Sequence, residues 1–337
     1  MASYLYDVIR RRMPAADKVF IENHDGATIT YGDLDAGSAR MANVLKRLGV
    51  RPGDRVAVQV DKSPEALLLY LGCVRAGAAF LPLNTAYTPA EIEYFLGDAE
   101  PWVFVCEPAN RDRLAAVAAK AGVAHVETLG VSRDGSLMDQ ATEAATTFED
   151  IDRGPDDLAA ILYTSGTTGR SKGAMLSHDN LASNALTLVD YWRFTSNDVL
   201  IHALPIYHTH GLFVATNTLL LAGGSLLFLP KLDAEAIMRL MPRATSMMGV
   251  PTFYTRLLQH PGLTPAATKH MRLFISGSAP LLAETHREWK ARTGHAILER
   301  YGMTETNMNT SNPYDGDRVA GTVGFPLPGV IARVCDP

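Results

Sequence analysis

The sequence is poor in cysteine, and the few cysteines it has stand far apart. Cys73, Cys106 and Cys335 are the only three among 337 residues. This number and spacing exclude a disulfide framework and a cysteine-based zinc site. Isolated thiols are instead typical of a reducing compartment, so we expect a cytoplasmic protein.

The chain also lacks positive net charge and long apolar runs. Its formal net charge is -5, so nothing in the overall balance attracts nucleic acid or an anionic membrane. The longest apolar run, from Leu219 to Pro230, is broken by two glycines and a serine and is too short to cross a bilayer. The N-terminus shows no signal-peptide pattern. We therefore expect neither a nucleic-acid nor a membrane partner.

Strand-like apolar runs alternate with helical patterns along most of the chain. Such alternation indicates an α/β fold with a mainly parallel sheet. A stretch rich in Gly, Asp, Glu and Thr at 130–157 interrupts the alternation, which then resumes. The expected organisation is a first α/β subdomain over 1–150, a second over 151–312 that includes a glycine-rich loop, and the start of a small β subdomain over 313–337.

That loop, residues 163–173, reads Tyr-Thr-Ser-Gly-Thr-Thr-Gly-Arg-Ser-Lys-Gly and lies between two runs that predict strands. Its glycines expose backbone N–H groups, its hydroxyls donate hydrogen bonds, and Lys172 adds a positive charge. Together these groups suit a polyphosphate. The common P-loop is excluded, because glycine follows the lysine and a strand follows the loop. By composition alone, a flexible polar surface loop explains the stretch equally well.

Three further motifs follow predicted strands, where ligands of open α/β sheets gather. They are Pro205-Ile-Tyr-His-Thr-His-Gly211, Ser276-Gly-Ser-Ala-Pro280 and Tyr301-Gly-Met-Thr-Glu305. The small residues of the second motif let a flat ring approach the backbone. The aromatic ring, hydroxyl and carboxylate of the third suit a base, a phosphate and Mg²⁺. Taken singly, a plain turn explains each of these two motifs.

Two other interpretations of the motifs are weaker. His208 and His210, with His202 nearby, suggest a metal site, but no third Cys or His stands at ligand spacing. A packing or substrate-contact role is therefore favoured. Ser278 is not a hydrolase nucleophile, because the order Gly-x-Ser-x-Gly is absent.

Together and in this order, the four motifs resemble the acyl-adenylate-forming superfamily, which includes the acyl-CoA synthetases. The resemblance covers essentially the whole chain. It implies two stacked α/β subdomains in αβαβα layers, with ATP, Mg²⁺ and coenzyme A as cofactors. The residues implied to hold the ATP pyrophosphate are Thr164, Ser165, Gly166, Thr167, Thr168, Gly169 and Lys172. Those implied to surround the adenine are Gly277, Ser278, Ala279 and Tyr301.

The resemblance also implies residues at the reacting centre. Thr304 would contact the α-phosphate, and Glu305 with Thr164 would bind Mg²⁺. His208 would stand between the acid and the nucleotide. With Lys172, these residues would form the catalytic set.

Substrate choice depends on Arg300, because in the superfamily the residue before the Tyr-Gly-x-Thr-Glu motif lines the acid pocket. A buried guanidinium without a partner is costly. A dicarboxylic acid removes that cost, since one carboxylate reacts while the other pairs with the arginine. The alternative is an intramolecular ion pair of Arg300 with Glu299 or Glu284.

The runs around Arg300 and His208 resemble the malonyl-CoA synthetase group of the superfamily. The further residues implied to line the acid pocket are Thr209, Arg256, Ser276 and Met308. We expect a ligase that forms malonyl-AMP from malonate and MgATP, and then malonyl-CoA. The alternatives are an adenylation domain for another small acid and a nucleotide-binding module without turnover.

Superfamily members continue past the equivalent of Pro337 into a smaller C-terminal domain that carries a catalytic lysine. We therefore expect the chain to be the N-terminal part of a longer enzyme, with that domain as its partner. We expect the 337-residue piece to bind ATP or AMP weakly and to make no measurable malonyl-CoA.

Overall fold

The computed structural model describes residues 3–164, 170–333 and 335. The predictions for Ser165, Gly166, Thr167, Thr168 and Gly169 lie outside the described residues. Contacts group the chain into two compact units. Unit 1 comprises Met1–Lys18, Ile29–Ala182 and Ile206–His208, and unit 2 comprises Val19–Thr28, Ser183–Pro205 and Thr209–Pro337.

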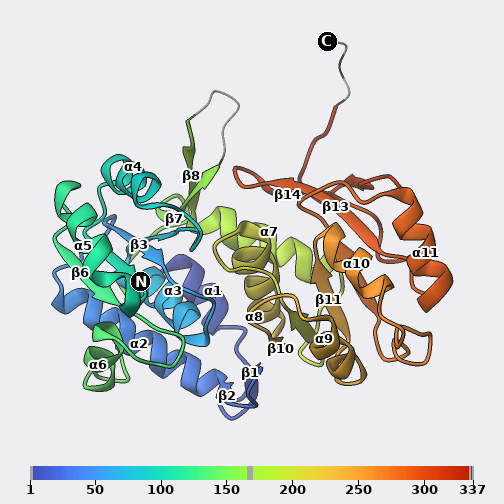
Figure 1. The fold of residues 1–337 in the computed structure, drawn as a ribbon, viewed down its shortest axis with the longest axis horizontal. Coiled ribbons are helices and arrows are strands. Elements are labelled where there is room, and N and C mark those ends of the chain that lie inside the picture. Colours follow the sequence, from blue (N-terminus) through green and yellow to red (C-terminus); the bar gives the residue numbers. More distant parts are fainter. Residues whose placement is uncertain (1–2, 165–169, 334, 336–337) are drawn as a thin grey trace. The chain divides into compact units, whose positions relative to one another are not determined.

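Unit 1 is built on a six-stranded sheet of order β6-β5-β3-β4-β7-β8 (Figure 1). Its strands are β3 (Arg55–Gln59), β4 (Ala79–Pro82), β5 (Val103–Cys106), β6 (His125–Thr128), β7 (Leu158–Thr164) and β8 (Lys172–Ser177). Its helices are α1 (Tyr4–Arg10), α2 (Tyr31–Arg47), α3 (Pro64–Ala76), α4 (Pro89–Ala99), α5 (Arg111–Lys120) and α6 (Ser136–Thr142), with a 3₁₀ turn at Pro108–Asn110. All neighbouring strands are parallel except β7 and β8, which are antiparallel.

Local sequence signals explain where these helices begin and end. Ser63 accepts a hydrogen bond from Ala66 N and precedes Pro64, while Thr88 forms a capping box with Glu91. Gly77 ends α3 in the left-handed conformation with φ 73°, which glycine adopts without strain. Thr30 is the N-cap of α2, and Asp33 supplies the reciprocal bond of a capping box from the third helical position.

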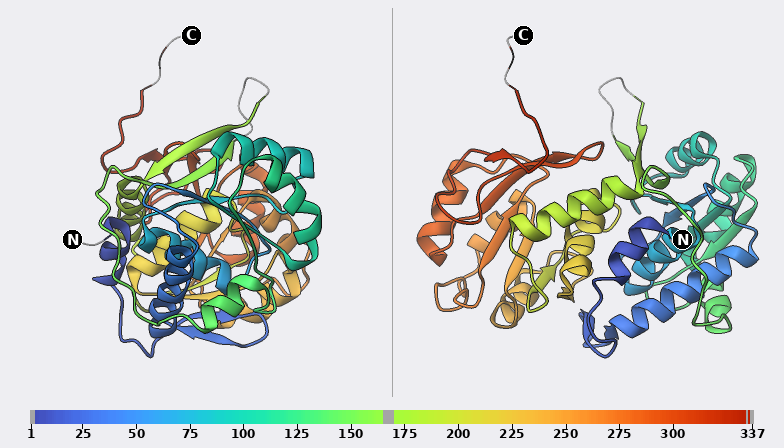
Figure 2. Two further views of the ribbon diagram at one scale, coloured as in Figure 1. Left: turned by 90° about the vertical axis from the view of Figure 1, so that its left-hand side faces the viewer. Right: turned by 180° about the vertical axis from the view of Figure 1, so that it is seen from behind.

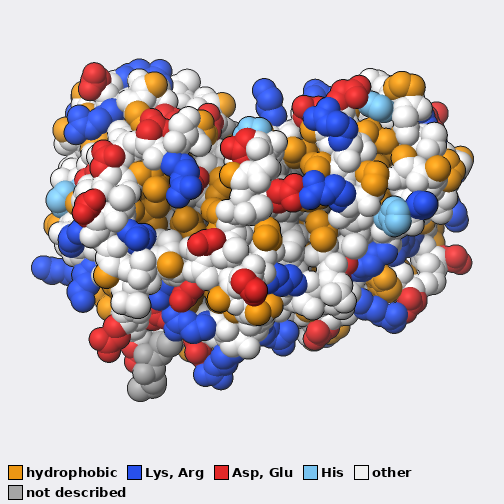
Figure 3. Space-filling view, turned by 90° about the horizontal axis from the view of Figure 1, so that it is seen from below, with side chains coloured by type: hydrophobic (Ala, Val, Ile, Leu, Met, Phe, Trp, Pro, Cys, Tyr) orange, Lys and Arg blue, Asp and Glu red, His pale blue; other side chains and the backbone are white. Residues whose placement is uncertain are grey.

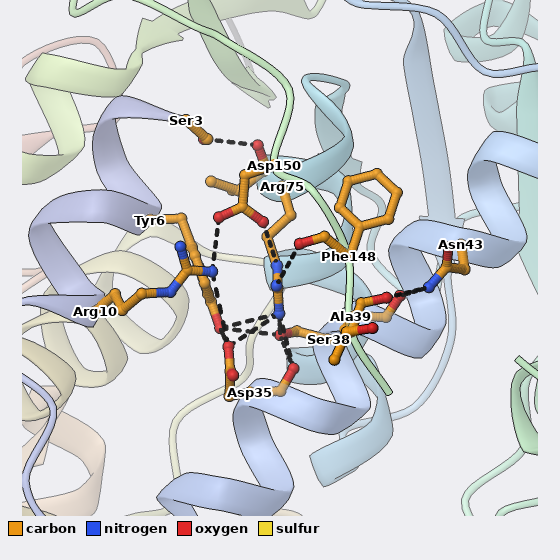
Figure 4. A network of polar contacts seen from close by, with 12 residues as sticks. Ser3, Tyr6, Arg10, Asp35, Ser38, Ala39, Asn43, Arg75, Phe148 and Asp150 are labelled. Carbon is orange, nitrogen blue, oxygen red and sulfur yellow. Dashed lines mark hydrogen bonds and ion pairs between the residues drawn. The ribbon is translucent and has the colours of Figure 1, made fainter. Parts of the chain in front are cut away.

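A buried polar network joins α1, α2 and α3 of unit 1 to the segment before β7 (Figure 4). Arg75 is 2% exposed, and its Nε donates to Asp150 Oδ1 at 2.6 Å. Its Nη1 donates to Asp35 O at 2.7 Å, and Arg10 pairs with the other oxygen of Asp150 at 2.7 Å. Arg75 and Asp150 form a buried ion pair, and removing one partner from such a pair typically costs about 3–5 kcal/mol. This network therefore fixes the segment that leads into β7.

The second sheet has nine strands, in the order β15-β14-β13-β12-β11-β9-β10-β1-β2. They are β1 (Val19–Asn23), β2 (Thr28–Thr30), β9 (Val199–His202), β10 (Ser225–Phe228), β11 (Ser246–Gly249), β12 (Leu273–Ser276), β13 (Leu298–Met303), β14 (Asn307–Ser311) and β15 (Phe325–Pro326). The helices formed wholly or mostly by unit 2 are α7 (His178–Tyr191), a π-helix (His210–Asn217), α8 (Thr218–Ala222), α9 (Ala234–Leu240), a 3₁₀ turn (Met241–Arg243), α10 (Pro251–Leu258) and α11 (Ala283–Thr293). Strands β1, β10, β9, β11, β12 and β13 run parallel, and β13, β14 and β15 are antiparallel.

The expected α/β fold with mainly parallel sheets is therefore confirmed. One grouping differs, because β7 and β8 join the six-stranded sheet rather than the strands that follow them (Figures 1 and 2). The link is the pairing of Phe80 in β4 with Ala160 in β7, a long-range contact that leaves no local sequence signal. The boundaries expected at residues 150 and 312 remain predictions.

The surface and the helices add two observations. On the face seen in Figure 3, Lys and Arg side chains are interspersed with Asp and Glu, and no large area carries one sign. Among the described residues, no helix has both the length and the apolar character that crossing a membrane requires.

Candidate functional site

The strand order of the second sheet reverses at β9, which has β10 on one side and β11 on the other. Open α/β sheets bind ligands beyond the carboxyl ends of the strands at such a point. Strand β13 pairs with β12 only as far as Ser276 and Glu299, and from Arg300 onward it pairs with β14. Ser276, Gly277 and Arg300 therefore lie together at this end of the sheet.

Arg300 is a buried cation with open donors. Its side chain is 3% exposed, and Nε and Nη2 have no hydrogen-bond partner within the described part of the chain. Burial lowers the pKa of Arg300 to about 9, which still leaves the guanidinium charged at neutral pH. A charged group in this state is unfavourable unless an anion joins it.

The alternative ion pair of Arg300 with Glu299 or Glu284 is not found among the described residues. Neighbouring residues of a strand point to opposite faces, so Glu299 points away from Arg300. Its carboxylate instead accepts a hydrogen bond from Leu281 N at 2.9 Å. Burial raises the pKa of this carboxyl above its ordinary value. Glu284 is exposed on α11.

The surroundings of Arg300 are shaped to admit it. A Cβ on Gly277 would stand 2.4 Å from Cζ of Arg300, so only glycine leaves room for the guanidinium. Ser276 is buried, and its Oγ also has no partner within the described residues. On the adjacent helix α10, the Tyr254 hydroxyl donates to Ile275 O at 2.6 Å and fixes the end of β12. Within the described part of the chain, the result is a cation and a hydroxyl without hydrogen-bond partners at the ends of neighbouring strands.

Other predicted pocket residues of unit 2 vary in exposure. Thr209 is buried and its Oγ1 has no partner among the described residues, while Met308 is buried at 3% exposure. Ser278 has a left-handed backbone with φ 70°, and its Oγ lies 3.2 Å from His210 Nδ1. Arg256 is exposed on α10, so its contact with a substrate remains a prediction.

The predicted nucleotide motif forms the hairpin of β13 and β14, not a turn after Arg300 as the sequence suggested. Strand β13 continues to Met303 because β14 pairs with it, and a bulge falls between Tyr301 and Gly302. The Tyr301 side chain is 45% exposed, as a stacking surface for a base needs to be. Thr304 is half-buried and Glu305 exposed in the connecting turn.

Glu305 suits the predicted metal. Its carboxylate is the hard oxygen ligand that Mg²⁺ prefers, and Mg²⁺ usually takes one or two carboxylates plus phosphate oxygens. Within the residues that the structure describes, no group of three or more His, Cys, Asp or Glu side chains is gathered. His202, the third histidine considered for a metal site, instead has its Nε2 at 2.9 Å from the carbonyl oxygen of Gly211.

In unit 1, the predicted loop is flanked by two paired strands, as expected. Thr164 at the end of β7 lies opposite Lys172 at the start of β8, and Lys172 is exposed. His208 is also exposed, with its ring 4.7 Å from that of Tyr207. The roles of these residues toward phosphate and acid remain predictions.

Helix α4 holds both strands of this loop, which the sequence did not reveal. The Tyr163 hydroxyl donates to Asp98 Oδ2 at 2.5 Å, and the Tyr94 hydroxyl donates to Ser171 O at 2.8 Å. Burial and the nearby Asp98 carboxylate both raise the pKa of Tyr163. No local pattern marks Tyr94 or Asp98, because their partners stand more than sixty residues away along the chain.

Comparison with known proteins decides the family. The model of the AMP-binding enzyme family matches residues 10–337. The chain belongs to this family. The malonate–CoA ligase of Arabidopsis thaliana is 32% identical to it over 356 residues, which cover 95% of this chain and 58% of the relative. The mitochondrial malonate–CoA ligase ACSF3 of Mus musculus is 33% identical, covering 90% and 55%.

A solved structure is closer in sequence. The crystal structure of ATP-bound MatB from Rhodopseudomonas palustris is 66% identical with a TM-score of 0.97, covering all of this chain and 67% of that one. The superfamily resemblance and the fold are thus confirmed. The chain spans a little over half the length of the two curated relatives.

Proposed function

We propose that the chain carries the acid- and nucleotide-binding part of an ATP-dependent ligase that joins malonate to coenzyme A. One observation carries the choice of acid: Arg300 is buried, charged and open at Nε and Nη2. A carboxylate that accepts two parallel bonds from a guanidinium is the anion that best satisfies such a group. The malonate–CoA ligases among the relatives support the same class of acid.

The reaction follows from these groups in two steps. With the distal carboxylate of malonate held by Arg300, the other carboxylate attacks the α-phosphorus of ATP, and the bond to pyrophosphate breaks. Lys172 and Thr304 would stabilise the charge that develops on the phosphates, and Tyr301 would stack on the adenine beside Gly277, Ser278 and Ala279. Mg²⁺ held at Glu305, with Thr164, would neutralise the phosphate oxygens. The coenzyme A thiolate then attacks the acyl carbon and AMP leaves.

The pocket would suit a short diacid. Thr209, Ser276 and Met308 would bound it, and His208 would separate the acid from the nucleotide. Arg256 would add a second cation at its exposed mouth.

The cytoplasmic location suggested by the cysteines stays a prediction, and one relative is a mitochondrial protein.

The test is ATP–pyrophosphate exchange by the full-length gene product with a panel of acids: malonate, methylmalonate, succinate, acetate and benzoate. We expect exchange with malonate or methylmalonate and little with the monocarboxylic acids. Preference for acetate or benzoate would assign the chain to another acid. Nucleotide binding without exchange for any acid would favour a module without turnover.

A further inference from the structure

Helix α7 holds strand β14 at one backbone position, that of Met308. Asn184 Nδ2 donates to Met308 O at 2.9 Å, and Met308 N donates to Asn184 Oδ1 at 3.3 Å. This two-point contact satisfies both backbone polar groups of one residue, as a neighbouring strand would. Strand β15 does not reach this position, because it pairs with β14 only at Thr310 and Ser311.

The Met308 side chain is fixed only as well as its backbone is. Methionine has several rotatable bonds and fills irregular gaps, so packing alone specifies its position weakly. A Cβ added to Gly302 would stand 2.5 Å from the Met308 methyl carbon, so this methyl carbon lies directly against the backbone of Gly302. The bulge between Tyr301 and Gly302 interrupts the ladder of β13 and β14 beside this contact. Asn184 therefore supplies a restraint that the interrupted ladder does not.

We propose that Asn184 is a positioning residue for acid selectivity. By holding Met308 N and O, it fixes the Met308 side chain at the wall of the acid pocket and so limits the substituent that a short dicarboxylic acid carries at its central carbon. This inference rests on the proposed function, in which Met308 bounds that pocket. Asn184 itself touches neither acid nor nucleotide.

The same two elements offer a matched control. Trp192, the residue after α7, donates from Nε1 to Ser311 Oγ at 3.0 Å in a buried contact further along β14. Ser311→Ala removes this hydrogen bond between α7 and β14 without touching Met308. If Asn184 served only to dock the helix on the sheet, the two variants would act alike.

The experiment measures kcat/KM in pyrophosphate exchange for malonate and for 2-ethylmalonate, with the KM for ATP and the melting temperature, in the full-length gene product. In Asn184→Ala, we expect the malonate preference to fall by about tenfold, because small changes of fit in an acid pocket are worth about 10–200-fold. The KM for ATP should change little. Ser311→Ala should lower the melting temperature yet keep the wild-type preference.

An unchanged preference in Asn184→Ala, or an equal loss in Ser311→Ala, would overturn the inference while leaving the proposed function intact. If Asn184→Ala does not fold, Asn184→Asp serves instead, since it keeps the acceptor for Met308 N and places a carboxylate against Met308 O. It should also lose preference, and a wild-type ratio there counts against the inference. A wild-type protein that uses no diacid at all would overturn the proposed function and this inference with it.

Discussion

The guanidinium of Arg300 lies against the backbone of Gly277, where a Cβ would stand 2.4 Å from Cζ and 2.5 Å from Nε. The two residues belong to motifs on neighbouring strands, one implied to hold the adenine and the other the acid. The absence of a side chain at 277 is thus what lets the cation occupy its site. In the proposed function, acid binding and nucleotide binding would meet at this contact.

Gly277→Ala tests that relationship. A methyl group has no room there unless the guanidinium moves, so we expect the KM for malonate to rise by about tenfold or more, and the KM for ATP to rise less. Steady-state pyrophosphate exchange measures both constants. Gly97→Ala is the control, because a Cβ at that position in α4 meets nothing within 4 Å. A rise in the KM for ATP alone would mean that the glycine serves the nucleotide and not the Arg300 guanidinium.

Arg300→Met should separate stability from function. The methionine fills similar space without a buried, unpaired charge, so we expect the ligand-free protein to gain about 1–3 kcal/mol in unfolding free energy. Malonate-dependent exchange should fall by at least about a hundredfold, since a charge-assisted contact to the distal carboxylate is lost. Urea unfolding and exchange assays on one preparation measure both. A less stable variant would show that Arg300 is satisfied in the free protein.

Asp98→Asn and Tyr94→Phe address the support that α4 gives to the strands flanking the predicted phosphate loop. Each weakens one hydrogen bond to the strands that end at Thr164 and begin at Lys172, so Lys172 should be less well placed. We expect the KM for ATP to rise by about three- to tenfold, with the KM for malonate nearly unchanged. Glu93→Gln on the same helix is the matched control, because the ion pair that Glu93 forms among the described residues is with the exposed Lys120 at 3.6 Å. If Glu93→Gln raises the KM for ATP by the same factor, the effect comes from changing α4 in general and not from the two hydrogen bonds.

His178 makes the stability of unit 1 depend on pH. It is fully buried, its Nδ1 accepts from Leu5 N at 3.3 Å, and burial with the nearby Arg153 lowers its pKa to about 4. The unfolded chain binds a proton near pH 6.5 while the folded chain does not, so the stabilisation is present above pH 6.5 and is lost as pH falls toward 4.

Urea midpoints at pH 7 and pH 5 measure this loss. In His178→Gln the decrease between the two pH values should be smaller than in the wild type. The matched control His24→Gln, at an exposed position, should keep the wild-type decrease. An equal decrease in all three proteins would assign the pH dependence to other groups.

Sequence reasoning found what is local and missed what is long-range. Ser63 with Pro64, and Thr88 with Pro89, predict the starts of α3 and α4, because in each case a capping residue directly precedes a proline at the first helical position. Arg300 was recognised from its place beside a motif. Asn184, by contrast, stands in an ordinary helical pattern, and only the fold brings it to Met308, 124 residues away.

The extension of β13 through Tyr301 was missed for the same reason. A strand continues where a partner is available, and β14 follows only after the turn at Thr304. The pairing of β4 with β7 likewise depends on which strands are neighbours in the sheet. Patterns within a window predict elements, whereas the registers between them arise from packing of the whole chain.

The chain of 337 residues offers a last test, since it spans about two thirds of the MatB structure that it resembles. The two sheets and their helices form their own cores, so we expect this piece to fold and to bind ATP or AMP weakly. Adenylation in the superfamily also uses a lysine from a C-terminal domain, and one such charged contact is typically worth about 10²–10³-fold in rate. In the proposed function, the C-terminal domain that the resemblance implies would aim the coenzyme A thiol. We therefore expect no measurable malonyl-CoA from residues 1–337 expressed by themselves with malonate, MgATP and coenzyme A. Calorimetric titration with ATP checks binding, with Thr304→Ala as the variant that should weaken it.

A thioester assay of the piece, alone and mixed with a separately expressed C-terminal domain of the same gene product, checks turnover. Robust thioester formation by the piece alone would show that residues 1–337 already hold the machinery of both steps.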